Sequence, residues 1–112
     1  MRVSRDAVGT DIQRTFQDVL MAAQGRGNGR TPRGGGQVGA VPTDGNSLLP
    51  GEWADDVAYA SHVVYHYGTP IAWVDARHGF WVVPDVKYSA QTSGVQNRIR
   101  EYLKDSGTAY RS

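Results

Sequence analysis

The sequence contains no cysteine, so neither disulfide bonds nor thiolate-bound metal ions can stabilise the fold. This absence also fits a reducing compartment such as the cytoplasm. The longest apolar run is far shorter than the ~18 residues that a membrane-spanning helix needs. Residues Met1 to Ala7 are charged and contain no apolar block, which predicts that there is no secretory signal. We therefore expect a cytoplasmic protein with no membrane segment.

A strong excess of charge of either sign is missing as well. The 12 basic and 11 acidic residues leave a formal net charge of +1. This balance argues against an acidic mimic of DNA and against a highly basic packaging protein. A chain of 112 residues forms one domain at most. Its core is then close to the smallest size that is sufficient for stability.

Residues 25–36 lack both apolar and acidic side chains, but they include Arg26, Arg30 and Arg33. Such a segment cannot bury enough surface to offset the loss of conformational entropy on folding. One interpretation is a flexible linker that continues to residue 47. The other is a small basic arm that binds phosphates. The composition predicts a helix over residues 1–24, a linker over 25–47, an α+β domain over 48–107 and a frayed tail over 108–112.

Two segments have the spacing of amphipathic helices. The first, residues 10–24, has an apolar stripe of Ile12, Phe16, Val19, Leu20 and Ala23, and the second, beginning at residue 93, has a stripe of Val95, Ile99, Tyr102 and Leu103. Capping boxes are expected at Thr10 with Gln13 and at Ser93 with Gln96. Gly25 and Gly107 suit the C-terminal ends of these helices. The first helix either packs on a sheet or docks on a partner or a second copy of the chain.

Three short strands are expected between the helices, over residues 61–67, 71–75 and 80–83. The third strand could continue past Pro84 to Tyr88 as an edge strand. The predicted fold is therefore α+β: an N-terminal helix, a flexible Gly/Arg-rich tether, and a three-stranded antiparallel sheet with a C-terminal helix packed on it. Trp53, ahead of these strands, is predicted to anchor packing.

Both faces of the predicted sheet are rich in apolar and aromatic side chains, whereas a half-exposed antiparallel sheet has one polar face. One face can be covered by the last helix. The other needs the first helix, a second copy of the chain or a ligand. We expect an aromatic interaction surface, and its members are Tyr65, Tyr67, Trp73 and Trp81.

One group of residues could carry chemistry. Asp75, Asp85 and Lys87 have the pattern of a metal-dependent nuclease, in which two carboxylates hold Mg²⁺ and a lysine polarises water or phosphate. The pattern is short and common by chance, so a turn with surface charges is the alternative. His62 and His66 are four residues apart, which is ~13 Å on a strand and too far for a shared metal ion. We predict no metal and no cofactor.

The residues YGTPIAW at 67–73, WVVPDVKYS at 81–89 and TS at 92–93 carry a resemblance to a known domain. The pattern resembles a small uncharacterised domain of actinobacterial, actinobacteriophage and haloarchaeal proteins, and it covers about the last half of the chain. Gln91, Gly94 and Val95 depart from it, where that domain often has a basic residue and a histidine. The resemblance implies a phage-type accessory protein in the host cytoplasm, with no implied reaction.

The sequence as a whole predicts a non-enzymatic protein that binds nucleic acid. The expected contacts are basic residues of the linker, the sheet and the last helix: Arg26, Arg30, Arg33, Arg77, Lys87, Arg98, Arg100 and Lys104. An alternative is a protein-interaction module that inhibits or redirects a host protein through the aromatic surface and the first helix. The metal-dependent nuclease is the third hypothesis.

Overall fold

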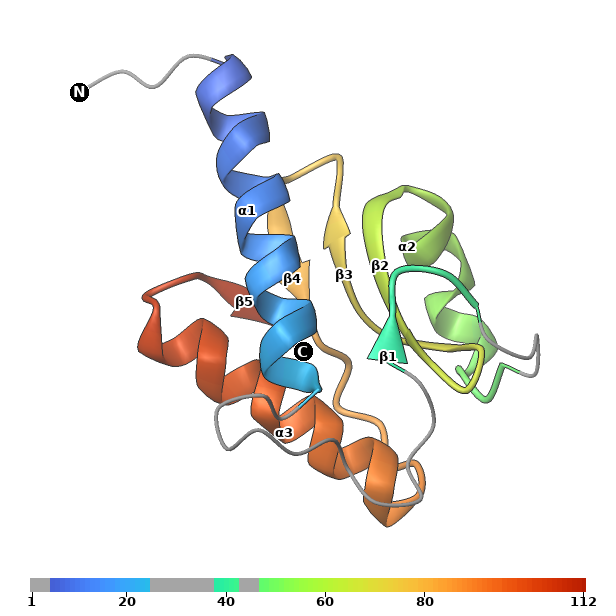
Figure 1. Ribbon diagram of the computed structural model, residues 1–112. Helices are drawn as coiled ribbons and strands as arrows, with labels where there is room; N and C mark the ends of the chain where they lie inside the picture. Colours follow the sequence, from blue (N-terminus) through green and yellow to red (C-terminus); the bar gives the residue numbers. More distant parts are fainter. Residues whose placement is uncertain (1–4, 25–37, 43–46) are drawn as a thin grey trace.

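The computed structural model describes residues 5–24, 38–42 and 47–112, which form an α+β fold (Figure 1). Its helical elements are α1 (Arg5–Ala23), the 3-10 helix η2 (Gly51–Trp53), α2 (Ala54–Ala58) and α3 (Ala90–Asp105). The N-terminal and C-terminal helices expected from the sequence are therefore present. None of the helices in the described part of the chain has the length and apolar character needed to cross a membrane.

The described residues form one five-stranded mixed sheet in the order β1-β2-β3-β4-β5. Its strands are β1 (Val38–Gly39), β2 (Ala60–His66), β3 (Thr69–Asp75), β4 (Phe80–Val82) and β5 (Tyr110–Arg111). All neighbouring pairs are antiparallel except β4 and β5, which are parallel. The three predicted strands are present as β2, β3 and β4 and pair antiparallel, but the sheet has five strands and is mixed, so the predicted three-stranded antiparallel sheet is corrected. The two additional strands have two residues each, which is too short for an alternating pattern to be recognised.

The sheet is most regular at the β2–β3 hairpin. Tyr67 and Gly68 connect the two strands, with φ angles of 53° and 77°. Two positive φ values in succession are typical of a type I′ turn, whose twist matches that of the paired strands. The strands predicted over 61–67 and 71–75 left residues 68–70 for the turn, but Thr69 and Pro70 already pair with β2.

Helices α1 and α3 cover one face of the sheet. Phe16, Val19 and Ala23 of α1 are buried in the same hydrophobic cluster as Val95 and Ile99 of α3. The apolar stripe of the first helix thus packs inside the fold, as the first of its two interpretations expected. The ring of Phe16 stacks on Trp81 of β4, with the ring centroids 6.3 Å apart.

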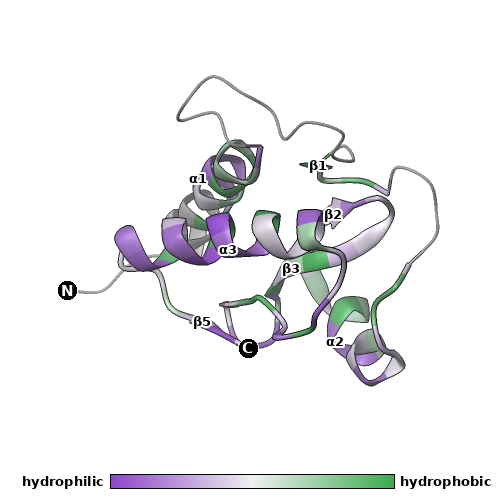
Figure 2. Ribbon diagram, turned by 90° about the horizontal axis from the view of Figure 1, so that it is seen from below, coloured by the Kyte–Doolittle hydropathy of each residue, from purple (hydrophilic) through white to green (hydrophobic). Residues whose placement is uncertain are grey.

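The other face is covered by the short helical segment formed by η2 and α2. Trp53 at the end of η2 packs edge-on against Trp73 of β3, with 5.7 Å between the ring centroids. The prediction that Trp53 anchors packing is confirmed. Figure 2 shows α1 and α2 on opposite sides of the strands. Both apolar faces of the sheet are therefore covered by segments of the same chain, one by α1 and α3 and the other by η2 and α2.

The N-terminal ends of both long helices differ from the prediction. Helix α1 begins at Arg5, so Thr10 lies inside it and cannot be its capping residue. Helix α3 begins after Ser89, whose side chain accepts a hydrogen bond from the backbone N–H of Thr92. Both capping boxes are therefore wrong. Gly107 does follow the end of α3 with a φ of 73°, as predicted, whereas Gly25 lies outside the described residues.

Two further expectations for the end of the chain are corrected. Strand β4 ends at Val82, so the third strand does not extend to Tyr88. The tail is not frayed, because Tyr110 and Arg111 pair with β4 and the backbone N–H of Val83 donates to the carbonyl oxygen of Arg111 at 2.9 Å. The segment between Val83 and α3 is an irregular loop.

Candidate functional site

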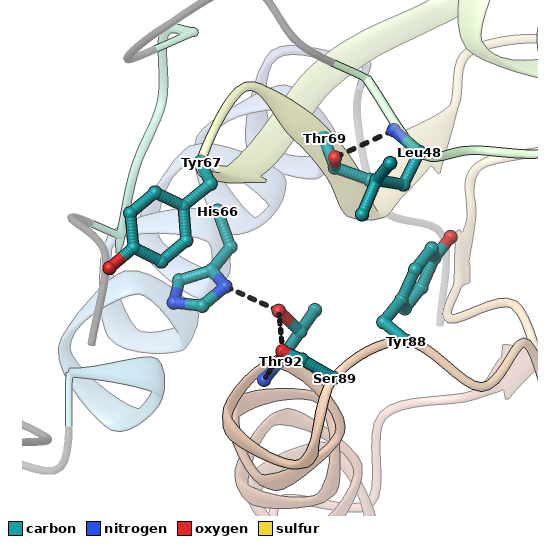
Figure 3. A pocket seen from close by; sticks show the side chains of 7 residues that line it. All are labelled: Leu48, His66, Tyr67, Thr69, Tyr88, Ser89 and Thr92. Atoms are coloured by element: carbon teal, nitrogen blue, oxygen red, sulfur yellow. Dashed lines mark hydrogen bonds between the residues drawn. The ribbon is translucent and has the colours of Figure 1, made fainter. Parts of the chain in front are cut away.

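A pocket of about 230 Å³ lies where the β2–β3 turn meets the N-terminus of α3 (Figure 3). We call it the α3 pocket, and its lining consists of Leu48, His66, Tyr67, Thr69, Tyr88, Ser89 and Thr92. Except for Leu48 and His66, these residues belong to the segments that carry the sequence resemblance. The fold therefore brings parts of all three segments together at one concave surface.

A chain of hydrogen bonds runs along one wall of the pocket. The Ser89 hydroxyl accepts a bond from the N–H of Thr92 and donates to Thr92 Oγ1 at 3.2 Å. Thr92 Oγ1 in turn lies 2.8 Å from Nδ1 of His66. Because a hydroxyl oxygen can accept two hydrogen bonds, either Thr92 Oγ1 or Nδ1 of His66 can be the donor of this contact, depending on the tautomer of the ring. The other ring nitrogen, Nε2, is buried and has no hydrogen-bond partner among the residues that the structure describes.

The surroundings of His66 favour the uncharged form of its ring. Its side chain is only 1 % exposed. Burial, followed by the nearby charge of Arg98, lowers the pKa of His66 below its ordinary value of 6.5. Arg98 is held in place by two hydrogen bonds, of 3.2 and 2.9 Å, to the carbonyl oxygen of Ala23 at the end of α1. No carboxylate contacts His66 among the residues that the structure describes, so the third member of a hydrolase triad is missing.

Two tyrosines form the aromatic walls. Tyr67 is 42 % exposed and packs edge-on against His66, with 4.9 Å between the ring centroids. The hydroxyl of Tyr88 is buried and has no hydrogen-bond partner within residues 5–24, 38–42 and 47–112, and burial raises the pKa of Tyr88 to about 12. The remaining wall is fixed by a 2.9 Å hydrogen bond from the N–H of Leu48 to Thr69 Oγ1. The lining is thus neutral, rich in hydroxyl groups and free of carboxylates.

Asp75, the first residue of the predicted metal site, is fully buried and surrounded by cations. Its Oδ1 accepts from the backbone N–H of Arg77 at 2.9 Å and from Nε of Arg77 at 3.3 Å. Its Oδ2 lies 2.8 Å from Nδ1 of His78 and 3.5 Å from Arg111. The hydrogen bond from His78, together with Arg77, lowers the pKa of Asp75 well below its ordinary value, although burial opposes this. These contacts give Asp75 a structural role in the β3–β4 hairpin.

The structure does not join Asp85 and Lys87 to Asp75. Both are exposed residues of the loop after β4, and no hydrogen bond or ion pair links either of them to Asp75 within residues 47–112. Because β4 ends at Val82, the strand spacing that placed Asp85 and Lys87 on one face does not apply. Within the described residues, no group of three histidine or acidic side chains could hold a metal ion.

The predicted nucleic-acid contacts are dispersed over different environments. Arg26, Arg30 and Arg33 lie outside the described residues. Arg77 lies over the ring of Tyr59 at 4.6 Å and pairs with Asp56 at 3.3 Å.

The predicted contacts on the last helix and on the loop before it also lie in different environments. Arg98 caps the end of α1, and Arg100 donates to the carbonyl oxygen of Pro84 at 3.0 Å. Lys87 and Lys104 are both exposed, and neither has a partner in the part of the chain that the structure describes. These two lysines are thus available for an anionic partner, whereas Arg98 and Arg100 hold the fold together.

The predicted aromatic interaction surface is wrong for two of its four members. Trp73 is fully buried and Trp81 is 3 % exposed, because helical segments cover both faces of the sheet. Tyr65 is half-buried, and only Tyr67 is substantially exposed. The sequence analysis missed the pairing of His66 with Thr92, since nothing in their spacing indicates that these residues meet.

Comparison with protein-family models, with curated proteins and with solved structures gives no match for this chain. The resemblance noted in the sequence therefore stays a prediction. The geometry of the α3 pocket is therefore the feature of the chain that bears on its function.

Proposed function

We propose that this chain is a non-enzymatic protein that binds single-stranded nucleic acid and holds one base in the α3 pocket. The observation that supports the proposal is the pocket's combination of an exposed aromatic wall with a wall of hydroxyl groups. Pockets for whole small molecules enclose about 300–1,000 Å³. A pocket of about 230 Å³ is better suited to one group of a larger partner.

A nucleobase suits the chemistry of this pocket. Every base has a flat π-face that can stack on an aromatic ring such as Tyr67. The hydroxyl groups of Ser89 and Thr92 can both donate and accept hydrogen bonds to the polar edge of a base. None of the described residues that line the pocket has a carboxylate that would repel the phosphates of the strand. Lys87 immediately precedes Tyr88 in the chain and supplies a cation for the phosphate backbone of the nucleic acid.

The net charge of +1 limits the electrostatic part of the affinity. Each phosphate that is neutralised contributes a slope of about −0.7 to a plot of log K against log salt for a single strand. We therefore expect a shallow salt dependence, with stacking as the main source of affinity.

Fluorescence anisotropy with labelled single-stranded DNA and RNA, measured from low to moderate salt, tests the proposal. The wild-type chain is expected to bind, and Lys87→Ala is expected to make the salt slope shallower by about 0.7. Lys104→Ala, a matched change of an exposed lysine on α3, is expected to leave the slope unchanged. Absence of binding to both kinds of strand at low salt would contradict the proposal.

A protein-interaction module is the second candidate. It is favoured by the 70 % exposure of Leu48, an apolar residue of the pocket lining, because an apolar side chain of a partner could occupy the pocket. On this alternative, oligonucleotides do not bind. Peptides selected for binding to the chain would instead lose affinity when Tyr67 is replaced by alanine.

A further inference from the structure

Tyr67 has a backbone conformation that its residue type disfavours. Its φ of 53° lies in the left-handed region, and it is the only non-glycine residue with positive φ in the described part of the chain. The first position of a type I′ turn favours asparagine, aspartate or glycine. A large aromatic residue there is strained, because its Cβ crowds the backbone.

Tyr67 is only partly packed against the fold. The residue is 42 % exposed, so part of its surface remains in contact with solvent. One of its contacts is an edge-on approach of its ring to the ring of buried His66. Strained backbone that is retained at an exposed position occurs preferentially at binding sites.

The ring of Tyr67 lies at the edge of the α3 pocket. Figure 3 shows Tyr67 and Tyr88 on opposite sides of the pocket, with Ser89 and Thr92 on a third side. A planar group that enters between the tyrosines therefore has an aromatic face beside it and hydroxyl groups at its edge. The exposed face of Tyr67 is the part of this lining best suited to stacking.

We propose that Tyr67 is kept in the strained turn because its ring stacks on the ligand, and that it is the main affinity-determining residue of the α3 pocket. The inference rests on the proposed function, with a base of a single strand as the ligand. The strained conformation of Tyr67 lowers the stability of the folded chain, and its stacking contact raises the affinity for the ligand. Asparagine would restore the favoured turn and remove the stacking surface.

The test measures thermal stability and oligonucleotide affinity for Tyr67→Asn, Tyr67→Phe and the control Tyr59→Asn. Tyr59 is also an exposed tyrosine, at 56 %, but its φ is an ordinary −99°. For Tyr67→Asn we expect the Tm to rise by about 4 °C and the affinity to fall by roughly 5- to 100-fold, as for loss of one stacking contact. Tyr67→Phe should bind within about twofold of wild type. Tyr59→Asn should not raise the Tm and should bind as wild type.

The possible failures are distinguishable. If the wild-type chain binds oligonucleotides and Tyr67→Asn binds equally well, the inference about Tyr67 is wrong while the proposed function stands. If Tyr67→Asn lowers the Tm, the tyrosine is retained for packing and the inference is also wrong. If the wild-type chain binds no oligonucleotide, the proposed function itself fails.

Discussion

At the scale of single residues, Asp75 and His66 are both buried, and their surroundings favour opposite charge states. Asp75 receives hydrogen bonds from Arg77 and His78, which stabilise its carboxylate. Burial of His66, followed by the nearby charge of Arg98, lowers the pKa of its ring and favours the neutral form. Asp75 therefore stabilises the fold, and His66 keeps the α3 pocket uncharged.

Replacing Asp75 by asparagine is expected to lower the free energy of unfolding by about 2–3 kcal/mol, because charge-assisted hydrogen bonds are lost and an amide group faces donors. Urea denaturation at pH 7 measures the change. Asp85→Asn is the matched control, since Asp85 is exposed, and its effect should stay within about 0.5 kcal/mol. Equal stability of Asp75→Asn and the wild-type chain would remove the structural role assigned to this carboxylate.

The same carboxylate gives a pH dependence of known sign. The pKa of Asp75 is lower in the folded chain than its ordinary 3.8, so the unfolded chain binds the proton more readily. The stabilisation is fully present well above pH 3.8 and is lost as the pH falls below that value toward the folded-state pKa. The wild-type chain should therefore lose its stability advantage over Asp75→Asn in strong acid.

His66 produces a second pH effect in a different window. Its folded-state pKa lies below 6.5, so stability is fully present above pH 6.5 and declines as the pH falls through 6.5 toward the lowered pKa. His66→Gln should flatten the decline in unfolding free energy between pH 7 and 5. His62, whose pKa is also lowered by burial, contributes to the same window in both proteins. An unchanged decline in His66→Gln would show that His66 is not buried in its neutral form.

At the scale of elements, the sequence predicted what periodicity can encode. The apolar stripes of α1 and α3 and the central strands β2, β3 and β4 follow from local patterns. Helix starts were wrong because a capping-box pattern is only four residues long and also occurs within helices. Gln96 was predicted to complete a capping box with Ser93. Its side chain instead donates to the carbonyl oxygens of Ile71 and Pro84, a long-range role that the local sequence does not indicate.

The corrected start of α3 leads to a direct prediction. Ser89→Ala should lower the free energy of unfolding by about 1 kcal/mol, because the backbone N–H of Thr92 loses its side-chain acceptor. Ser93→Ala, the matched change at the position first predicted as the cap, should have little effect or stabilise α3 slightly. Thermal or urea denaturation of the two variants decides between the two starts. A larger loss for Ser93→Ala would place the cap at Ser93.

At the scale of the whole molecule, the site is assembled from segments that are far apart in the sequence. Leu48, the β2–β3 turn and the start of α3 meet only after the sheet has formed and α3 has packed on it. The alternation of the strands correctly indicated two apolar faces. It could not show that α1, α3, η2 and α2 cover them, so two of the four members of the inferred aromatic surface lie in the core and the pocket was missed.

The central claim is that a base of a single strand enters the α3 pocket. The most direct test follows the backbone amide signals of the ¹⁵N-labelled chain by nuclear magnetic resonance while a short single-stranded oligonucleotide is added. The account predicts saturable shifts concentrated at Tyr67, Ser89 and Thr92. Shifts that are absent, or that cluster on the β3–β4 hairpin around Arg77 and leave the pocket unchanged, would contradict it.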